Sequence, residues 1–359
     1  MLGLYIHIPF CRKKCNYCDF VSQVAEDEQI LEYLEAIKIE MNKYFNFQIS
    51  TIYLGGGTPS ILSKDQIKEL FLNVKNIFDI KNLKEITVEA NPESLRKDKL
   101  EAFKNAGVNR LSMGLQSFDN KELKYLGRVH SIEDFKNCYK IARDTGFKNI
   151  SLDLIYGLPN QTKKVWENNL KKAVQFNPEH ISLYPLIIET GTLLHNIEAK
   201  VDEDLQAEVY EWSMDFLKKC GYEQYEISNW AKPGFESKHN LNYWHNGEYL
   251  GIGVSAASHY KNRRYKNTED IVLYMQNMKS GKDVFEEYEE ISYEKKLSEE
   301  IILNLRCSQG FLESNEINIK YGDIIDDLLK NNLIEKNKES VYLTRKGKLL
   351  ANQVMMRFV

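Results

Sequence analysis

The chain has 359 residues, of which 43% are hydrophobic and 28% are charged, which predicts two or three domains with a sizeable core. With 48 Lys and Arg residues, 52 Asp and Glu residues and a net charge of −4, it lacks the basic surplus needed to bind along nucleic acid. The longest apolar runs, such as residues 271–275, have about a quarter of the ~20 residues that cross a bilayer, so we expect at most peripheral membrane association. The first residues contain no secretory signal, and we expect a cytoplasmic protein.

Short β-rich runs alternate with helix-like segments over the first half of the chain. The runs lie at residues 4–8, 51–54, 85–89, 110–113, 149–154 and 180–184. The first helix is predicted by apolar residues at three- and four-residue steps, namely Ile30, Leu34, Ile37, Met41, Tyr44 and Phe45. Two pairs have the spacing of helix-start capping boxes: Ser63 with Gln66, and Ser131 with Asp134. This repeated alternation predicts an α/β fold with a parallel sheet, whose carboxyl strand ends build the ligand site.

The second half of the chain is organised differently. Residues 191–260 combine a helix near 204–220 with a segment rich in Tyr, Trp, His and Asn, which we interpret as an extension and cover of the sheet. From about residue 292, two helical stretches precede short β-rich runs at 333–335 and 341–343, a pattern that resembles a winged helix. The mixed charge of this last part argues against DNA binding. We therefore expect three parts, at residues 1–185, 186–285 and 286–359.

Three of the six cysteines, Cys11, Cys15 and Cys18, crowd into one loop directly after the first strand. The other three lie far apart in the sequence, so the cysteines are not evenly spread as they are in a protein with a disulfide framework. Thiolates of one short loop converge on a single centre, and a [4Fe-4S] cluster held by only three of them has one open iron. The alternative is zinc, but a structural zinc site needs four ligands, and no second Cys or His pair follows. His7 is the one nearby candidate for a fourth zinc ligand, and its place in the strand equally suits a buried histidine.

The Cys-x3-Cys-x2-Cys loop resembles that of the radical S-adenosylmethionine (SAM) superfamily, in which it follows the first strand of a partial (β/α)6 barrel. The resemblance implies that the open iron binds the amino and carboxylate groups of SAM. It also implies that the cluster, reduced by an electron donor, cleaves SAM to methionine and a 5′-deoxyadenosyl radical. In such systems the cofactor carries the redox chemistry and the protein positions and shields it.

Polar and glycine-rich segments follow the other predicted strands. Gly55-Gly56-Gly57-Thr58-Pro59 comes after the second strand, where glycines allow close approach to a ligand but equally suit a tight turn. Carboxylates, an amide and a guanidinium lie at or beyond the next strand ends: Glu89, Gln116, Arg128 and Asp153. These groups suit ribose hydroxyls, an amine and a carboxylate, although each alone also suits a loop cap or a surface ion pair.

Five segments together resemble a narrower family, which includes the oxygen-independent coproporphyrinogen III dehydrogenase and the HemW haem chaperones. They are residues 5–11, 55–60, 114–118, 153–159 and 251–256, and the resemblance extends into the C-terminal part, which is then a HemN-type winged-helix-like domain. Carried over position by position, the resemblance assigns SAM binding to Tyr5, Tyr17, Gly56, Gly57, Thr58, Glu89, Gln116, Arg128 and Asp153. It places the [4Fe-4S] cluster on Cys11, Cys15 and Cys18.

Three features favour the chaperone branch over the dehydrogenase branch. The dehydrogenases extend the cysteine loop to Cys-x-Cys, where this chain has Phe20, and they carry an N-terminal extension that we do not find here. The HemW branch has a His-Asn-x-x-Tyr-Trp motif, which residues 239–244 match. The resemblance thus assigns haem contact to His239, Asn240, Tyr243 and Trp244. An imidazole can ligate haem iron and aromatic rings can cover the macrocycle, with His245 as a competing ligand and ordinary packing as the alternative role.

The resemblance implies a haem chaperone that carries a [4Fe-4S] cluster and SAM and transfers haem to acceptor proteins such as respiratory enzymes. Coproporphyrinogen dehydrogenase activity is not expected, and no catalytic residue is assigned. The main alternative is an oxygen-independent coproporphyrinogen III dehydrogenase, that is, a radical SAM oxidative decarboxylase. The third function considered is that of a regulator, which would carry the cluster but perform no radical chemistry.

Overall fold

Six parallel strands form the centre of the fold in a computed structural model that describes residues 1–359. They are β1 (Gly3–Ile8), β2 (Thr51–Gly56), β3 (Glu85–Ala90), β4 (Arg110–Gln116), β5 (Ile150–Tyr156) and β6 (His180–Pro185). Each strand pairs in parallel with the next one in chain order. The predicted α/β fold with a partial (β/α)6 barrel is thereby confirmed.

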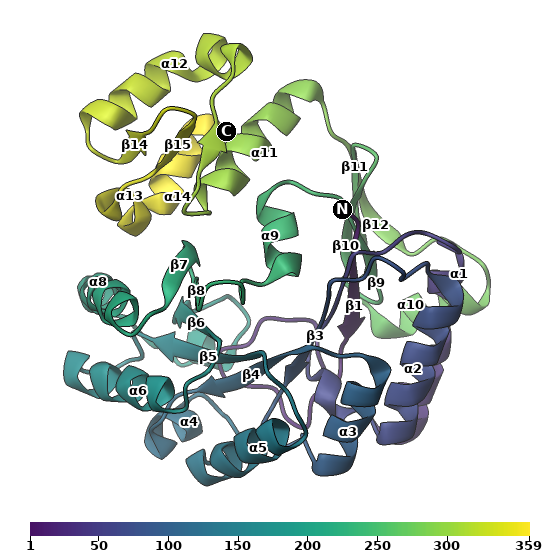
Figure 1. Cartoon of the computed structure of the whole chain (residues 1–359). Helices are drawn as coiled ribbons and strands as arrows, with labels where there is room; N and C mark the ends of the chain where they lie inside the picture. Colours follow the sequence, from purple (N-terminus) through teal and green to yellow (C-terminus); the bar gives the residue numbers. More distant parts are fainter.

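Helices cover the outer side of these strands (Figure 1). They are α1 (Asp27–Asn42), α2 (Lys64–Ile77), α3 (Lys97–Ala106), α4 (Asn120–Tyr125), α5 (Ile132–Asp144) and α6 (Lys163–Gln175), with a 3-10 turn at Pro59–Ile61. Both predicted capping boxes are present, at the starts of α2 and α5. In the predicted apolar stripe of α1, Ile30, Ile37 and Met41 are buried and Leu34 packs partly buried against the same core. The helix ends at Asn42 and Phe45 is 67% exposed, so the prediction was wrong for Phe45.

Further strands extend the sheet at both edges. Beyond β1 lie β9 (Tyr249–Ile252), β10 (Ala257–Tyr260), β11 (Arg263–Asn267) and β12 (Phe285–Glu290), and beyond β6 lie β8 (Asn229–Ala231) and β7 (Glu223–Glu226). The twelve strands run from β12 to β7 without pairing end to end, so the barrel is open. The helices of this region are α7 (Leu193–Asn196), α8 (Glu203–Lys219), α9 (Lys238–Trp244) and α10 (Ile271–Lys279). Strand β12 still belongs to the large sheet, although the third part was expected to begin at residue 286.

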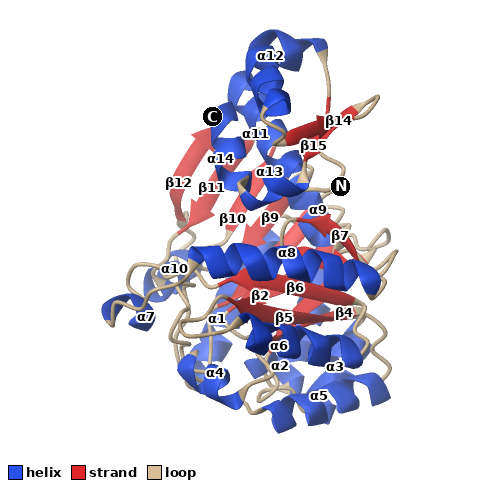
Figure 2. Cartoon of the chain, turned by 90° about the vertical axis from the view of Figure 1, so that its left-hand side faces the viewer, coloured by secondary structure: helices blue, strands red, loops and turns tan.

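The C-terminal part combines helices with a separate small sheet, as expected of a winged-helix-like unit (Figure 2). The helices are α11 (Tyr293–Leu305), α12 (Asn315–Lys330), α13 (Arg345–Leu349), α14 (Ala351–Met355) and a final 3-10 turn, Met356–Phe358. The strands β13 (Phe311–Leu312), β14 (Ile334–Lys336) and β15 (Ser340–Leu343) are antiparallel. A hydrophobic cluster of 14 buried residues holds this unit together, apart from the cluster of 59 under the large sheet. None of the helices is both long enough and apolar enough to span a membrane.

The two faces of the parallel strands differ in chemistry. On β2 and β3, residues such as Ile52, Leu54 and Val88 belong to the hydrophobic core beneath the outer helices. The alternate positions carry polar side chains, because successive residues of a strand point to opposite faces. Tyr53 and Glu89 are examples, and both line a cavity on the inner side. The hydrophobic core thus lies between the strands and the outer helices, and the polar side chains face the inside of the barrel.

Candidate functional site

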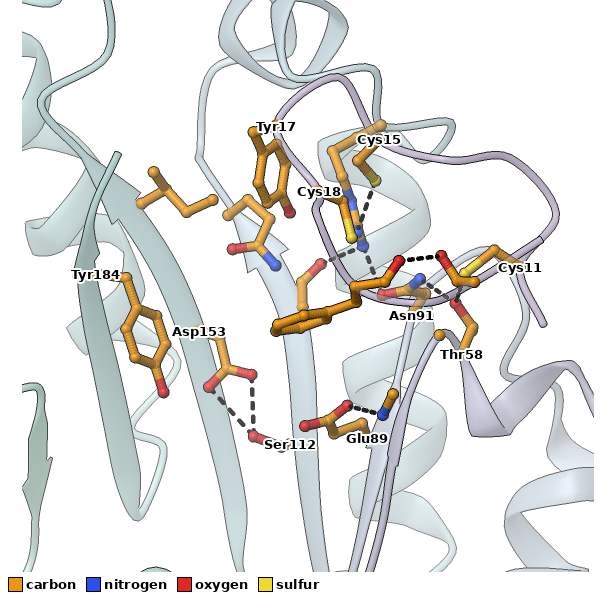
Figure 3. Close-up of a pocket in the computed structure, with 18 of the residues that line it drawn as sticks. Cys11, Cys15, Tyr17, Cys18, Thr58, Glu89, Asn91, Ser112, Asp153 and Tyr184 are labelled. Carbon is orange, nitrogen blue, oxygen red and sulfur yellow. Dashed lines mark hydrogen bonds between the residues drawn. The ribbon is translucent and has the colours of Figure 1, made fainter. Parts of the chain in front are cut away.

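The inner cavity, which we call the barrel cavity, has a volume of about 460 Å³ and is bordered by the cysteine loop (Figure 3). Backbone hydrogen bonds fix this loop on several sides. The Cys11 N–H donates to the Gln23 carbonyl at 2.9 Å, and the Asn16 N–H donates to the Leu126 carbonyl at 2.9 Å. All three loop cysteines line the cavity.

Two of the three thiols lie near polar donors. Thr58 Oγ1 donates to Cys11 Sγ at 3.3 Å, and Arg128 Nη1 lies 3.5 Å from Cys15 Sγ. Burial raises the pKa of the Cys11 thiol and raises that of Cys18 to about 11. No group of three His, Cys, Asp or Glu side chains is close enough to hold one metal ion. Three sulfur donors of one loop suit a cluster of several iron atoms, because each sulfur then binds a different iron.

The glycine segment packs directly against the base of the cysteine loop. Gly56 has a φ of +106°, and a Cβ built on it would lie 2.6 Å from the His7 ring. A Cβ on Gly57 would lie 2.8 Å from the Phe10 carbonyl oxygen and 3.0 Å from Cys11 Sγ. This close approach requires glycine whether or not a ligand is bound, and both glycines also line the cavity.

Two partly buried carboxyl groups face the barrel cavity, Glu89 from β3 and Asp153 from β5 (Figure 3). Glu89 accepts hydrogen bonds from the Tyr53 hydroxyl at 2.7 Å and the Gly56 N–H at 3.2 Å. Burial raises the pKa of Glu89 to about 7, and the nearby Asp153 adds to the increase. Asp153 accepts a hydrogen bond from Ser112 at 2.9 Å, and burial raises its pKa as well. Both groups offer acceptors to a hydroxyl- or ammonium-bearing ligand.

Arg128 crosses the rim of the same cavity. Its Nη2 donates to Asn91 Oδ1 at 2.6 Å and to the Gly114 carbonyl at 2.7 Å, while its buried Nε has no partner. Gln116 lies nearby at the end of β4, where the pairing with β5 is irregular, and it has a φ of +68°. Such backbone strain in a residue other than glycine concentrates at functional sites.

The structure brings most of the predicted SAM and cluster residues to this cavity. They are Cys11, Cys15, Tyr17, Cys18, Gly56, Gly57, Thr58, Glu89, Gln116, Arg128 and Asp153. Tyr5 does not line it; its ring stacks on Tyr53 with centroids 6.2 Å apart, and it faces a second cavity. Arg110, Ser112, Ser182 and Tyr184 were not predicted, although the alternation of polar residues along β4 and β6 was a usable signal.

The His-Asn-x-x-Tyr-Trp motif forms α9, whose start is held by β3. Glu85 accepts hydrogen bonds from the backbone N–H groups of Lys238 at 3.0 Å and His239 at 3.1 Å. The His239 side chain has 0% exposure, with Nδ1 bonded to Thr51 Oγ1 at 2.9 Å and Nε2 bonded to the Tyr243 hydroxyl at 2.8 Å. Burial lowers its pKa to about 3, so the ring is neutral. In contrast to our expectation, this conformation does not present His239 to a haem iron.

The second cavity, which we call the α9 cavity, has a volume of about 610 Å³ and lies between α9, β9–β11 and α11. The other three predicted haem residues, Asn240, Tyr243 and Trp244, line it, whereas His239 and His245 do not. Arg306 of the segment after α11 stacks over the Trp244 ring at 4.4 Å. Asn240 and Tyr53 line both cavities, so the two cavities are neighbours.

Comparisons with known proteins give a consistent result. Residues 5–173 match the Radical SAM superfamily. The chain is 38% identical to the heme chaperone HemW of Bacillus subtilis, an alignment covering 100% of this chain and 99% of the relative. It is 37% identical to HemW of Lactococcus lactis, with 99% and 96% covered. Its fold is similar to that of coproporphyrinogen III oxidase (HemN) from Escherichia coli, a radical SAM enzyme, with a TM-score of 0.87, 25% identity and 99% and 89% covered.

Proposed function

This chain belongs to the HemW family of the radical SAM superfamily, and from this we propose that it is a chaperone that binds haem and passes it to acceptor proteins such as respiratory enzymes. The observation that carries the proposal is the α9 cavity. Aromatic residues of the family motif line it, and it adjoins the barrel cavity.

In this proposal the barrel cavity holds the cofactors. Cys11, Cys15 and Cys18 bind a [4Fe-4S] cluster, which supplies one-electron reduction of SAM when it is loaded and reduced by an electron donor. The glycine segment approaches the cofactor closely, and Glu89, Gln116, Arg128 and Asp153 bind its polar groups. With a pKa of about 7, Glu89 can accept from hydroxyls as a carboxylate or donate one hydrogen bond when protonated.

Haem occupies the α9 cavity in this proposal. The cavity volume of about 610 Å³ falls in the 300–1,000 Å³ range typical of small-molecule sites. Tyr243 and Trp244 supply flat apolar faces for the macrocycle. His239 anchors α9 to Thr51 of β2, so it positions the aromatic residues rather than touching the ligand. In this proposal Tyr5 forms part of the wall between the two cavities, because its ring stacks on Tyr53.

The test is a haem titration of anaerobically purified protein with a reconstituted cluster, followed by the Soret absorbance. Wild-type protein should bind haem stoichiometrically, and Trp244→Ala should weaken the affinity at least tenfold because it removes one wall. Cys18→Ala is the matched control, since it should lose the cluster and keep haem binding. Absence of haem binding by the wild-type protein would overturn the proposal.

A second measurement separates the chaperone from the alternative enzyme. Coproporphyrinogen III is incubated with the reconstituted protein, a reductant and SAM, and protoporphyrinogen is measured. We expect none, because Phe20 stands where the dehydrogenase branch has its extra cysteine. Catalytic turnover would instead favour the decarboxylase.

A further inference from the structure

A row of three side chains from adjacent strands faces the α9 cavity. In the register of the sheet, His259 of β10 pairs with Tyr249 of β9 on one side and with Arg264 of β11 on the other. Residues paired across neighbouring strands point to the same face, and all three line the cavity. The adjacent Ser258 points the opposite way, and its buried Oγ accepts a hydrogen bond from the Gly251 N–H at 2.8 Å.

His259 is the one histidine among the residues that line this cavity. His239, on α9, is buried with both ring nitrogens bonded to Thr51 and Tyr243. His245, at the end of α9, is exposed and belongs to neither cavity. An imidazole ligand for a molecule in the α9 cavity must therefore come from the sheet in this conformation.

The environment of His259 suits metal binding. Burial lowers the pKa of His259, which favours the neutral ring, and a neutral imidazole keeps a free electron pair on one nitrogen. In contrast to His239, the His259 ring forms no hydrogen bond with another side chain.

The opposite walls of the cavity suit a flat apolar ligand. Tyr243 and Trp244 come from α9, and Ile302 and Leu303 come from α11. Arg264 shares the wall with His259, but Glu299 of α11 neutralises it through two hydrogen bonds of 2.7 and 3.0 Å. The cavity therefore combines one available imidazole with aromatic and aliphatic walls and a paired charge.

We propose that His259 is the axial ligand of haem iron in the α9 cavity. This inference rests on the proposed haem-binding function and adds the coordinating residue to it. It assigns His239 a positioning role and leaves the exposed His245 outside the site.

The experiment titrates ferric haem into the full-length protein and follows the Soret maximum, the electron paramagnetic resonance spectrum and the dissociation constant. His259→Ala should change both spectra and weaken haem binding at least tenfold, and added imidazole should restore the wild-type spectra by filling the vacated space. His259→Gln has nearly the same volume and serves as the second variant if the alanine protein does not fold. His195→Ala, at an exposed position of α7, is the matched control and should behave as wild type.

Unchanged spectra and affinity in a folded His259→Ala or His259→Gln protein would overturn the assignment, as would a spectral change confined to His245→Ala. Failure of the wild-type protein to bind haem is a different result, because it would overturn the proposed function itself.

Discussion

Replacing Glu89 with Gln should stabilise the ligand-free protein above pH 7 and weaken SAM binding. Burial raises the pKa of Glu89 from 4.5 to about 7, above its value in the unfolded chain. The protonated Glu89 carboxyl therefore makes its full contribution to the free energy of unfolding below about pH 4.5. This contribution is lost as the pH rises through about 7. The difference between these pKa values corresponds to about 3 kcal/mol, at ~1.36 kcal/mol for each pKa unit.

The Gln side chain keeps the local hydrogen bonds, because its carbonyl can accept from the Gly56 N–H and its amide can donate to the Tyr53 hydroxyl. Urea unfolding at pH 5 and pH 8.5 measures the effect. The free energy of unfolding of Glu89→Gln, relative to that of wild type, should increase by roughly 2 to 3 kcal/mol from pH 5 to pH 8.5. The exposed Glu69→Gln on α2 is the control and should give the same small effect at both pH values. A Glu89→Gln advantage that does not change with pH would refute the reasoning.

Three further predictions concern the barrel cavity. Cys15→Ala should lose the [4Fe-4S] cluster, and an iron analysis that still finds about four iron atoms per chain would contradict the assignment. Asp153→Ala should weaken SAM affinity at least tenfold in a calorimetric titration, since losing one partner of a buried charged contact costs ~2–5 kcal/mol; unchanged affinity would place SAM elsewhere. Gly57→Ala should displace the cysteine loop, because the new Cβ would lie 2.8 Å from the Phe10 carbonyl oxygen, so cluster content per folded chain should fall. Full cluster content in that variant would show that the loop tolerates the contact.

Local sequence patterns predicted the frame of the fold well. The six parallel strands begin within one residue of their predicted starts, because β-rich runs alternate with helical periodicity. The capping boxes at Ser63 and Ser131 depend on contacts only three residues apart, and both are formed. Where α1 ends was harder to predict. The apolar spacing continues to Phe45, but the chain turns at Asn46, which has a φ of 64°.

The α9 region shows why contacts distant in sequence escape such patterns. His239 has the residue type of a haem ligand, but its partner Thr51 lies 188 positions away on β2. Nothing near His239 in the sequence reveals that contact. His259 belongs to no motif, and only the register of β9, β10 and β11 brings it into line with Tyr249 and Arg264. Sequence thus located the motif, and the fold of α9 and its tertiary packing decide which of the motif's side chains face a cavity.

The most direct test of the chaperone function is haem transfer. The protein with a reconstituted cluster is loaded with one equivalent of haem, freed of excess ligand and mixed with membranes that contain a haem-free respiratory enzyme. We predict that the Soret absorbance moves from the chaperone to the membrane fraction and that respiratory activity appears, whereas protein lacking haem produces neither change. Haem that stays on the loaded protein, or activity that appears equally fast with free haem alone, would contradict the account.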